Sequence, residues 1–206
     1  MEKFTRITAT ACPLPAENID TDQILPARYL KLPRKGEHGK VLFQDLRFDA
    51  AGNERSDFPL NRTPWRAAKI IVGGRNFGGG SSREAAVYAL FDYGIRCVIA
   101  PSFGDIFTQN ATKNGLLTAV VSEPESSALT AALTHEPTLL VSVDLEEKMI
   151  ICGELRYQFT IEPARQTHLL NGWDDIDITE SFQDQIGKFK AANLKRRPWT
   201  IPNRTI

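Results

Sequence analysis

The stretch Gly73–Tyr88 contains the residue types that chemistry on a small anion needs. Five of its first eight residues are glycines, and Ser81, Ser82 and Arg83 follow them directly. Glycine lets the backbone adopt positive φ and approach a ligand closely. Hydroxyls and a guanidinium at a helix start bind carboxylates and phosphates, and the same groups stabilise a serine alkoxide. The stretch therefore predicts an anion site with a reactive serine.

The same residues allow a second interpretation. Ser81 and Glu84 form the pattern S-x-x-E, which is typical of a capping box that only starts a helix and contributes about 1 kcal/mol. Arg83 is then a surface arginine. The glycines favour the anion site, because a capping box does not need them. The lysine of a P-loop is missing, and so is a convincing GxGxxG with a later acidic residue. A ligand smaller than a nucleotide is expected.

A second polar cluster is Asn18–Asp22, NIDTD, with two carboxylates and a hydroxyl in five residues. It lacks the glycine and the late glutamate of an EF-hand metal loop. A turn or cap held by Asx side chains is the alternative. The histidines His38, His135 and His168 are scattered and are predicted to be solvated loop or surface residues.

The composition excludes several classes of protein. The chain has 206 residues, 42% of them apolar, and Lys+Arg and Asp+Glu are 25 each. This balance of charges does not favour binding to nucleic acid, and no apolar run reaches membrane-spanning length. The N-terminus lacks the apolar core of a signal peptide. Cys12, Cys97 and Cys152 are odd in number and far apart, which indicates reduced thiols in a cytoplasmic protein rather than disulfides or a zinc site. Cys97 is expected in the core.

Apolar runs and turn residues predict an α/β fold with a partly parallel sheet. A strand at 4–10 is expected to break at Ala11–Pro15. Buried strands at 68–72, 96–100 and 116–121 alternate with helices at 81–93, ending at Gly94, and at 102–114, capped by Ser102, which implies parallel strands. The glycine stretch then follows the carboxyl end of a strand, where α/β proteins bind ligands.

The rest of the chain is predicted to add helices and strands to one domain over 1–206. The expected elements are a helix at 126–134, strands at 138–145, 149–152 and 156–161, a helix at 164–170 before Gly172, and a helix at 180–193. A flexible loop is predicted around 30–40, and a C-terminal helix plus tail occupies 180–206.

Several segments together resemble one family. They are NIDTDQILPARYL, GRNFGGGSSREAA, GIRCVIAPSFGDIF, NGLL and LLNGWDDIDIT, and they resemble the small subunits of 3-isopropylmalate dehydratase (isopropylmalate isomerase). In this family the swivel domain of aconitase is a separate chain. The resemblance runs from about residue 4 to Trp199. It implies a three-layer β/β/α swivel domain and a hydro-lyase of leucine biosynthesis, which isomerises 2-isopropylmalate to 3-isopropylmalate by dehydration and rehydration.

The resemblance also implies a partner. Such a chain is active only in a heterodimer with a large subunit, whose cysteines hold a 4Fe–4S cluster with an open iron that acts as a Lewis acid. This chain is then expected to hold no metal or cofactor itself. The substrate is a small dicarboxylate.

Roles for individual residues follow from the same resemblance. Ser81 corresponds to the base that removes the substrate's Cα proton, and Ser82, Arg83 and Gly80 to the carboxylate site. Asp22 corresponds to an aspartate that lines the site and orients a group of the large subunit.

Substrate discrimination is implied for Tyr29–Leu32, where an apolar side chain such as Tyr29 or Leu30 meets the isopropyl group. A second carboxylate is expected to bind Lys31, Arg34 or, less expected, Arg28; the sequence does not separate them.

Two positions differ from the family pattern. Ala85 replaces the histidine of SREH, and Gly79 stands where relatives often have Cys, Ser or Glu. The alternatives therefore remain the same chemistry on another small hydroxydicarboxylate of the methylmalate, citraconate or maleate type, or a non-catalytic anion-binding module.

Overall fold

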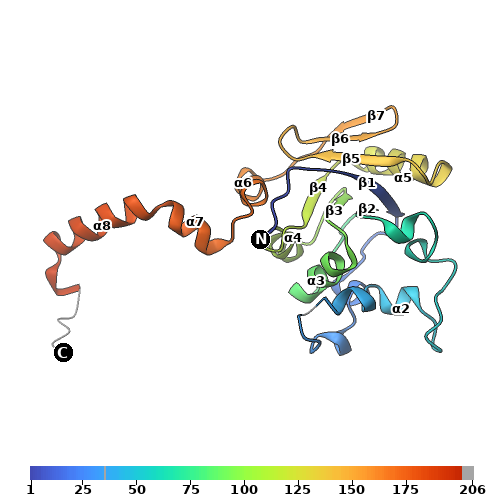
Figure 1. Ribbon diagram of the computed structural model, residues 1–206, viewed down its shortest axis with the longest axis horizontal. Helices are drawn as coiled ribbons and strands as arrows, with labels where there is room; N and C mark the ends of the chain where they lie inside the picture. The colour runs from blue at the N-terminus through green and yellow to red at the C-terminus, as the bar shows by residue number, and fades with distance from the viewer. Residues whose placement is uncertain (35, 201–206) are drawn as a thin grey trace.

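One seven-stranded sheet organises the chain in a computed structural model that describes residues 1–34 and 36–200 (Figure 1). Its strand order is β4-β3-β2-β1-β5-β6-β7. The strands are β1 (Arg6–Leu14), β2 (Ile70–Gly73), β3 (Cys97–Ala100), β4 (Leu117–Val120), β5 (Leu140–Asp144), β6 (Met149–Cys152) and β7 (Leu155–Gln158). Strands β1 to β4 pair in parallel, whereas β1, β5, β6 and β7 pair antiparallel.

Strand β1 joins the two halves of the sheet by changing partners along its length. Arg6–Thr10 pair with β5, and Ala11–Leu14 pair with β2. The predicted break at Ala11–Pro15 is therefore wrong, although Pro13 has no N–H. Beyond Thr10 the strand is paired on one side only, and proline is tolerated in a strand where one edge needs no donor.

The helices are α1 (Thr21–Ile24), α2 (Gln44–Arg47), α3 (Glu84–Tyr93), α4 (Asp105–Lys113), α5 (Glu123–His135), α6 (Pro163–Asn171), α7 (Asp175–Ser181) and α8 (Gln183–Arg196). Helices α3 and α4 pack on one face of the parallel half, and α5 packs on the other. Short 3-10 turns are η1 (Ala27–Tyr29), η2 (His38–Val41), η3 (Pro59–Asn61), η4 (Trp65–Ala67) and η5 (Pro198–Thr200).

Two buried clusters show that the molecule has three layers. On one face of the parallel half, Ile71 and Val98 belong to a cluster with Leu90 of α3 and Phe107 of α4. On the other face, residues of β2 and β3 belong to a cluster with α5 and the antiparallel half, which includes Val141 of β5. Burial of both faces explains why these strands are continuous apolar runs. The predicted α/β class with β/β/α layers is confirmed.

Several helix boundaries differ from the expected ones. The helix predicted from Ser126 begins at Glu123, because Ser122 and Glu125 form a capping box. The helix expected at 180–193 is found as α7 and α8, which meet at Phe182. Gly94 and Gly172 end their helices with positive φ, as predicted.

The 30–40 segment packs more tightly at its end than the sequence suggests. Lys35 lies outside the described residues. His38 is only 2% exposed, so its predicted surface position is wrong, whereas His135 is exposed and His168 is half-buried. A Cβ on Gly39 would lie 2.6 Å from the backbone of Asp92. Turn η2 therefore packs directly on α3, because glycine permits this approach.

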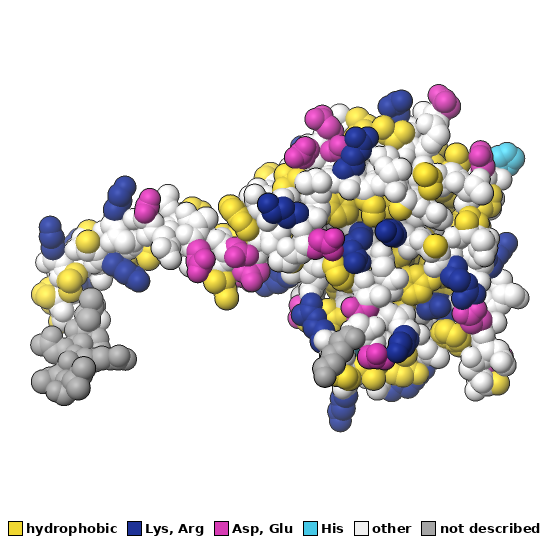
Figure 2. Space-filling model, in the orientation of Figure 1, with side chains coloured by type: hydrophobic (Ala, Val, Ile, Leu, Met, Phe, Trp, Pro, Cys, Tyr) yellow, Lys and Arg dark blue, Asp and Glu magenta, His cyan; other side chains and the backbone are white. Residues whose placement is uncertain are grey.

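The residues from Asp174 to Thr200, here called the C-terminal arm, leave the body of the molecule as α7, α8 and η5 (Figure 1). No residue of α7 or α8 is buried. Figure 2 shows apolar side chains along this projecting part.

Candidate functional site

The glycine loop (residues 74–83) begins where β2 ends and is fastened to the segment Asn18–Asp22. Gly78 N–H donates to the carbonyl of Ile19 at 2.7 Å, and Thr21 N–H donates to the carbonyl of Gly79 at 3.0 Å. The Asn76 amide donates to Asn18 Oδ1 at 2.9 Å. The two polar stretches that the sequence singled out therefore lie side by side at the carboxyl edge of the parallel half.

The segment after β3 fastens the loop from another side. Phe77 N–H donates to the carbonyl of Ser102 at 3.0 Å, and Gly104 N–H donates to the carbonyl of Phe77 at 3.0 Å. The Ser102 hydroxyl accepts from Asn76 N–H at 2.9 Å. Ser102 thus anchors the loop and is not the predicted helix cap, since α4 begins at Asp105 after Gly104.

The glycines are needed for close packing as well as for conformation. Gly78 has φ +71, and a Cβ there would lie 2.2 Å from the Phe107 ring. A Cβ on Gly79 would lie 2.9 Å from the Asn76 amide. Gly80 has φ +90 and faces Asp20, whose Cβ would be 3.5 Å from an added Cβ. The glycine at position 79, one departure from the family pattern, therefore makes room for Asn76.

Ser81 and Ser82 are exposed at the end of this loop. Helix α3 begins at Glu84, and its N-cap is Arg83 without a side-chain cap. The capping-box interpretation of Ser81 is therefore wrong. In the part of the chain that the structure describes, neither serine hydroxyl forms a hydrogen bond, so both can bind a ligand near the positive end of α3.

A hydrogen bond from Thr21 holds the backbone of Ser81 in place. Its hydroxyl donates to the carbonyl of Ser81 at 2.9 Å, and the residue is 2% exposed. Asp20 caps α1 in a capping box with Gln23, which confirms the cap interpretation of NIDTD. The sequence analysis counted the Thr21 hydroxyl in the NIDTD cluster but did not predict this supporting role, because a threonine in a polar turn is usually solvated.

Asp22 and Arg83 form an ion pair between the two segments. The Arg83 side chain is 17% exposed and the Asp22 side chain 52%. A guanidinium has five donors, so pairing with one carboxylate oxygen leaves others for a ligand. The structure thus brings Gly80, Ser81, Arg83 and Asp22 to one place.

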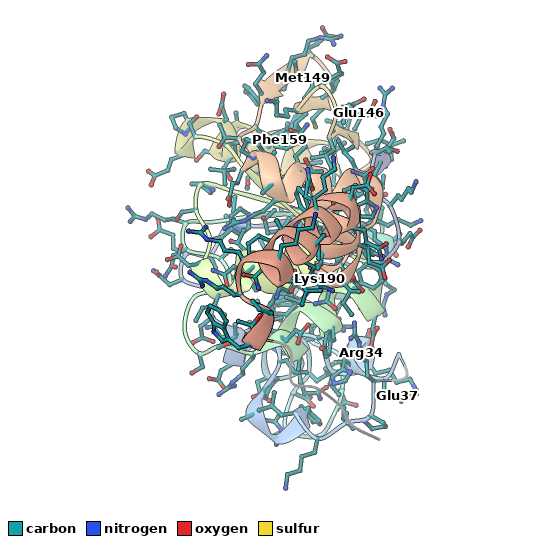
Figure 3. The ribbon with its side chains drawn as sticks, turned by 90° about the vertical axis from the view of Figure 1, so that its left-hand side faces the viewer. Arg34, Glu37, Glu146, Met149, Phe159 and Lys190 are labelled. Atoms are coloured by element: carbon teal, nitrogen blue, oxygen red, sulfur yellow. The ribbon has the colours of Figure 1, made fainter. Side chains whose placement is uncertain are left out.

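The other predicted binding residues lie on the segment that follows α1. Arg28 donates to Asp45 at 3.0 Å, and this bond holds the pKa of Arg28 above its ordinary value. Arg34 donates to Asn114 Oδ1 at 2.6 Å and stacks on the Tyr88 ring at 3.9 Å. Figure 3 shows Arg34 and Glu37 at one end of the molecule, with Glu146 and Met149 at the other.

The other predicted binding residues of this segment form few interactions with the rest of the described chain. Leu30 is 42% exposed and Tyr29 is partly buried. Lys31 is exposed and has no ion-pair partner within residues 1–34 and 36–200. Ala85 is partly buried against the cluster under α3, so the position of the family's histidine is filled by a packed methyl group.

The cysteines of this chain do not fit an iron–sulfur cluster. Cys12 packs in the helix-side cluster, whereas Cys97 and Cys152 pack in the cluster on the other face. Burial raises the pKa of the Cys12 and Cys97 thiols, which opposes the thiolate form that metals bind. The described residues contain no group of three His, Cys, Asp or Glu side chains arranged for a metal. Cys97 is a core residue, as predicted.

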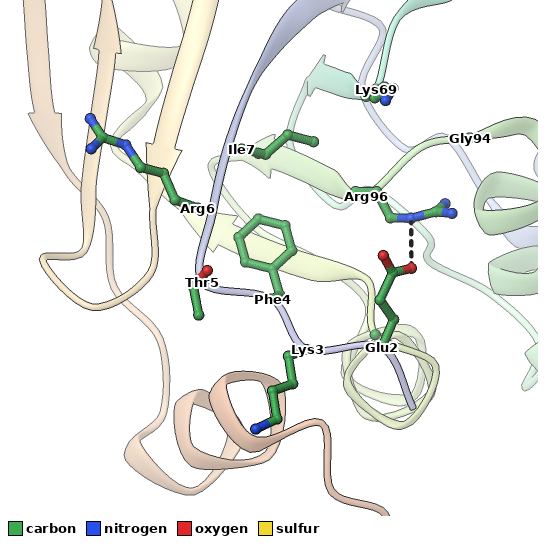
Figure 4. Close-up of a pocket in the computed structure, with 10 residues that line it drawn as sticks. Glu2, Lys3, Phe4, Thr5, Arg6, Ile7, Lys69, Gly94 and Arg96 are labelled. Carbon is green, nitrogen blue, oxygen red and sulfur yellow. Dashed lines mark ion pairs between the residues drawn. The ribbon is translucent and has the colours of Figure 1, made fainter.

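A hollow of about 480 Å³ lies at the opposite, amino edge of the parallel half (Figure 4). Glu2, Lys3, Arg6, Lys69 and Arg96 are among its lining residues. Arg96 Nε lies 3.8 Å from Glu2 Oε2, so part of its charge is balanced. None of the candidate site residues lines it.

Among the described residues, no helix has both the length and the apolar character that crossing a membrane requires.

Comparison with known proteins shows which family the chain resembles over most of its length. Residues 1–124 match the family described as the aconitase C-terminal domain. The 3-isopropylmalate dehydratase small subunit of Rhodospirillum centenum is 48% identical over 98% of this chain and 100% of its own length. That of Brucella canis is 44% identical over 97% and 100%. The crystal structure of 3-isopropylmalate dehydratase from Methanocaldococcus jannaschii is similar with a TM-score of 0.63 and 26% identity, over 90% of this chain and 99% of that one.

Proposed function

The chain belongs to the family of 3-isopropylmalate dehydratase small subunits, and we propose that it is the small subunit of a heteromeric hydro-lyase in leucine biosynthesis. The complex isomerises 2-isopropylmalate to 3-isopropylmalate by dehydration and rehydration. The observation that carries the proposal for this chain's part is the pair of exposed serine hydroxyls beside the Asp22–Arg83 ion pair.

Ser81 is the proposed base for the proton on the substrate's Cα. Its side chain is exposed, its own carbonyl accepts from Thr21, and Arg83 and the positive start of α3 follow it within three residues. These groups favour the alkoxide that a serine base requires. Proton abstraction beside a carboxylate builds negative charge, and fixed donors stabilise that charge more in the transition state than in the ground state.

Ser82 and Arg83 are the proposed binding site for one substrate carboxylate, and the backbone of Gly80 is proposed to line the same site. Asp22 holds one side of the Arg83 guanidinium and so fixes the direction of its remaining N–H groups. A fixed guanidinium binds a planar carboxylate with little loss of side-chain entropy.

Lys31 is the proposed cation for the second carboxylate. Arg28 is already paired with Asp45, and Arg34 is held by Asn114 and Tyr88. Lys31 is exposed and has no ion-pair partner among the described residues. It lies on the segment Tyr29–Leu32, whose Tyr29 and Leu30 side chains are proposed to contact the isopropyl group.

The partner is the proposed large subunit, which completes a site that is open in this chain alone. The 4Fe–4S cluster is proposed to belong to that subunit, since the thiols here are buried and separated. Free buried cysteines fit a reducing compartment, and we place the protein in the cytoplasm. The chain is proposed to work as one swivel domain from residue 1, with the C-terminal arm attached.

Reconstitution with the large subunit tests these roles. Ser81→Ala is expected to lower kcat by about 10³-fold, as the loss of a positioned base does. Ser56→Ala, at an exposed loop serine, is the matched control and is expected to keep full turnover. If Ser81→Ala keeps more than half of the turnover, Ser81 is not the base. In the same assay Lys31→Ala should raise KM more than Arg34→Ala does. If Arg34→Ala raises KM more, Arg34 and not Lys31 binds the second carboxylate.

A further inference from the structure

The C-terminal arm has an apolar surface that the body of the molecule does not cover. Ile176, Phe182, Phe189, Leu194 and Trp199 are among the exposed large apolar residues, with Phe189 at 70% and Trp199 at 76%. Phe182, the N-cap of α8, and Ile186 and Phe189 within it follow each other at spacings of four and three, which puts them on one face; Ile186 is half-buried. Such a stripe is typical of a helix that packs against something.

Helix α8 has little intrinsic stability to keep it formed alone. It has 14 residues, none of them buried, and isolated helices of this length are marginal in water. Gly187 in its interior costs about 1 kcal/mol relative to alanine. An outside contact is therefore the natural source of its stability.

Charge decides among the surfaces that could cover it. Helix α8 and the residue after it contain Lys188, Lys190, Lys195, Arg196 and Arg197 but only one acidic residue, Asp184. Two copies of α8 facing each other across a two-fold axis would bring these cations together, which is unfavourable. The surface that fits α8 is an apolar groove with carboxylates on its rim.

Among the described residues, the ion pair and the hydrogen bond that hold the arm to the body lie at its root. Lys113 of α4 forms an ion pair with Asp175 at 2.7 Å, and the N-terminal amine donates to the carbonyl of Gly172 at 2.8 Å. Helices α7 and α8 contain 7 and 14 residues, so together they extend for roughly 32 Å at about 1.5 Å per residue. A parallel strand of four residues spans only about 13 Å. Because the arm projects from the body over this length (Figure 1), it can reach a neighbouring chain.

We propose that the C-terminal arm is the docking element for the large subunit, which receives the Phe182–Ile186–Phe189 stripe in an apolar groove edged with carboxylates. This inference rests on the proposed function, because it assumes that a large subunit is the partner. The alignment to the Rhodospirillum centenum small subunit covers 98% of this chain, so it reaches into the arm. A relative that works as a small subunit therefore carries the corresponding segment.

The test is the dissociation constant of the full chain for the purified large subunit, measured by titration calorimetry. Phe189→Ser is expected to raise it at least about tenfold, as truncation of an aromatic anchor does. Leu140→Ser, at a 53% exposed leucine on β5, is the matched control and should leave it unchanged. Arg196→Glu should also weaken binding and reduce its salt dependence.

Other outcomes overturn the proposal. An unchanged dissociation constant for Phe189→Ser would remove the arm from the interface. If Phe189→Ser instead alters only self-association of the chain in sedimentation, the occupant is a second copy. Ser81→Ala separates this inference from the proposed function: it should bind the large subunit like the wild type while losing turnover. If the wild-type chain neither binds the large subunit nor gives turnover with it, the proposed function itself fails.

Discussion

The glycine loop and the C-terminal arm both expose their most distinctive side chains, but their backbones differ. The loop is joined to two neighbouring segments by hydrogen bonds from Phe77, Gly78 and Thr21. The arm's hydrogen bonds lie within the arm beyond its root, and no residue of α7 or α8 is buried.

This difference separates two reasons for exposure. The loop fixes the backbone of Ser81 and leaves its side chain exposed, as the proposed base requires, because such a hydroxyl has to be open to its substrate and yet held in place. An apolar side chain such as Phe189 gains nothing from exposure, and its helix has no internal support. An exposed side chain on a fixed backbone is typical of a residue that reacts with or binds a ligand. An exposed apolar side chain on a helix without internal support is typical of a surface that binds a partner.

The largest effect is expected from Gly78→Ala in the loop. The new Cβ would meet the Phe107 ring at 2.2 Å, at a backbone φ of +71. Overpacking and the left-handed conformation together should lower the free energy of unfolding by about 3 kcal/mol. Thermal unfolding should then move down by roughly 6–12 °C.

Gly52→Ala is the control for this substitution, because Gly52 has φ +84 but no heavy atom within 4 Å of its added Cβ. It should show only the conformational cost of about 1 kcal/mol. Equal losses in the two variants would mean that the loop does not depend on close packing.

Thr21→Val should have a smaller effect on stability and a specific effect on turnover. The change keeps the shape and removes the hydroxyl that donates to the Ser81 carbonyl at 2.9 Å. We expect a loss of about 1 kcal/mol in unfolding free energy and about a tenfold loss of kcat, because a small displacement of a catalytic group is costly.

Thr21→Ser restores the hydroxyl and should recover most of kcat in the reconstituted complex. If Thr21→Val lowers stability with no change in kcat, Thr21 supports the fold but does not position Ser81.

The buried strands were the most predictable part of the fold. AKIIV and RCVIA read as core strands because both faces of the parallel half are covered, and Cys97 follows the same rule. The prediction that the strand breaks at Ala11–Pro15 was wrong, because Pro13 lies where β1 is paired on one side only. A proline is tolerated there, since its missing N–H is not needed. Pairing partners are a property of the sheet and cannot be deduced from a local segment.

The site was predictable in its residue types and less so in its supports. Glycines and a following Ser-Ser-Arg mark the loop, but α3 begins only at Glu84, and the Ser81 carbonyl accepts from the Thr21 hydroxyl while Gly78 and Phe77 bond to Ile19 and Ser102. Those bonds join segments distant in sequence. Thr21 and Ser102 look like ordinary turn residues until the segments meet.

The smallest effect is expected from deletion of Gln183–Ile206, and it tests the arm's independence directly. Because α8 has no buried residue, its removal exposes little that was covered, and the thermal unfolding of the isolated chain should shift by less than about 1 °C. Leu169→Ala, in α6 just before the arm and fully buried, should cost about 2–5 kcal/mol and lower the unfolding temperature clearly. A drop of several degrees on deletion would show that α8 packs on the body in solution. In that case the contrast between a supported loop and an unsupported arm would no longer hold, and the exposed stripe on α8 would need a partner within this chain.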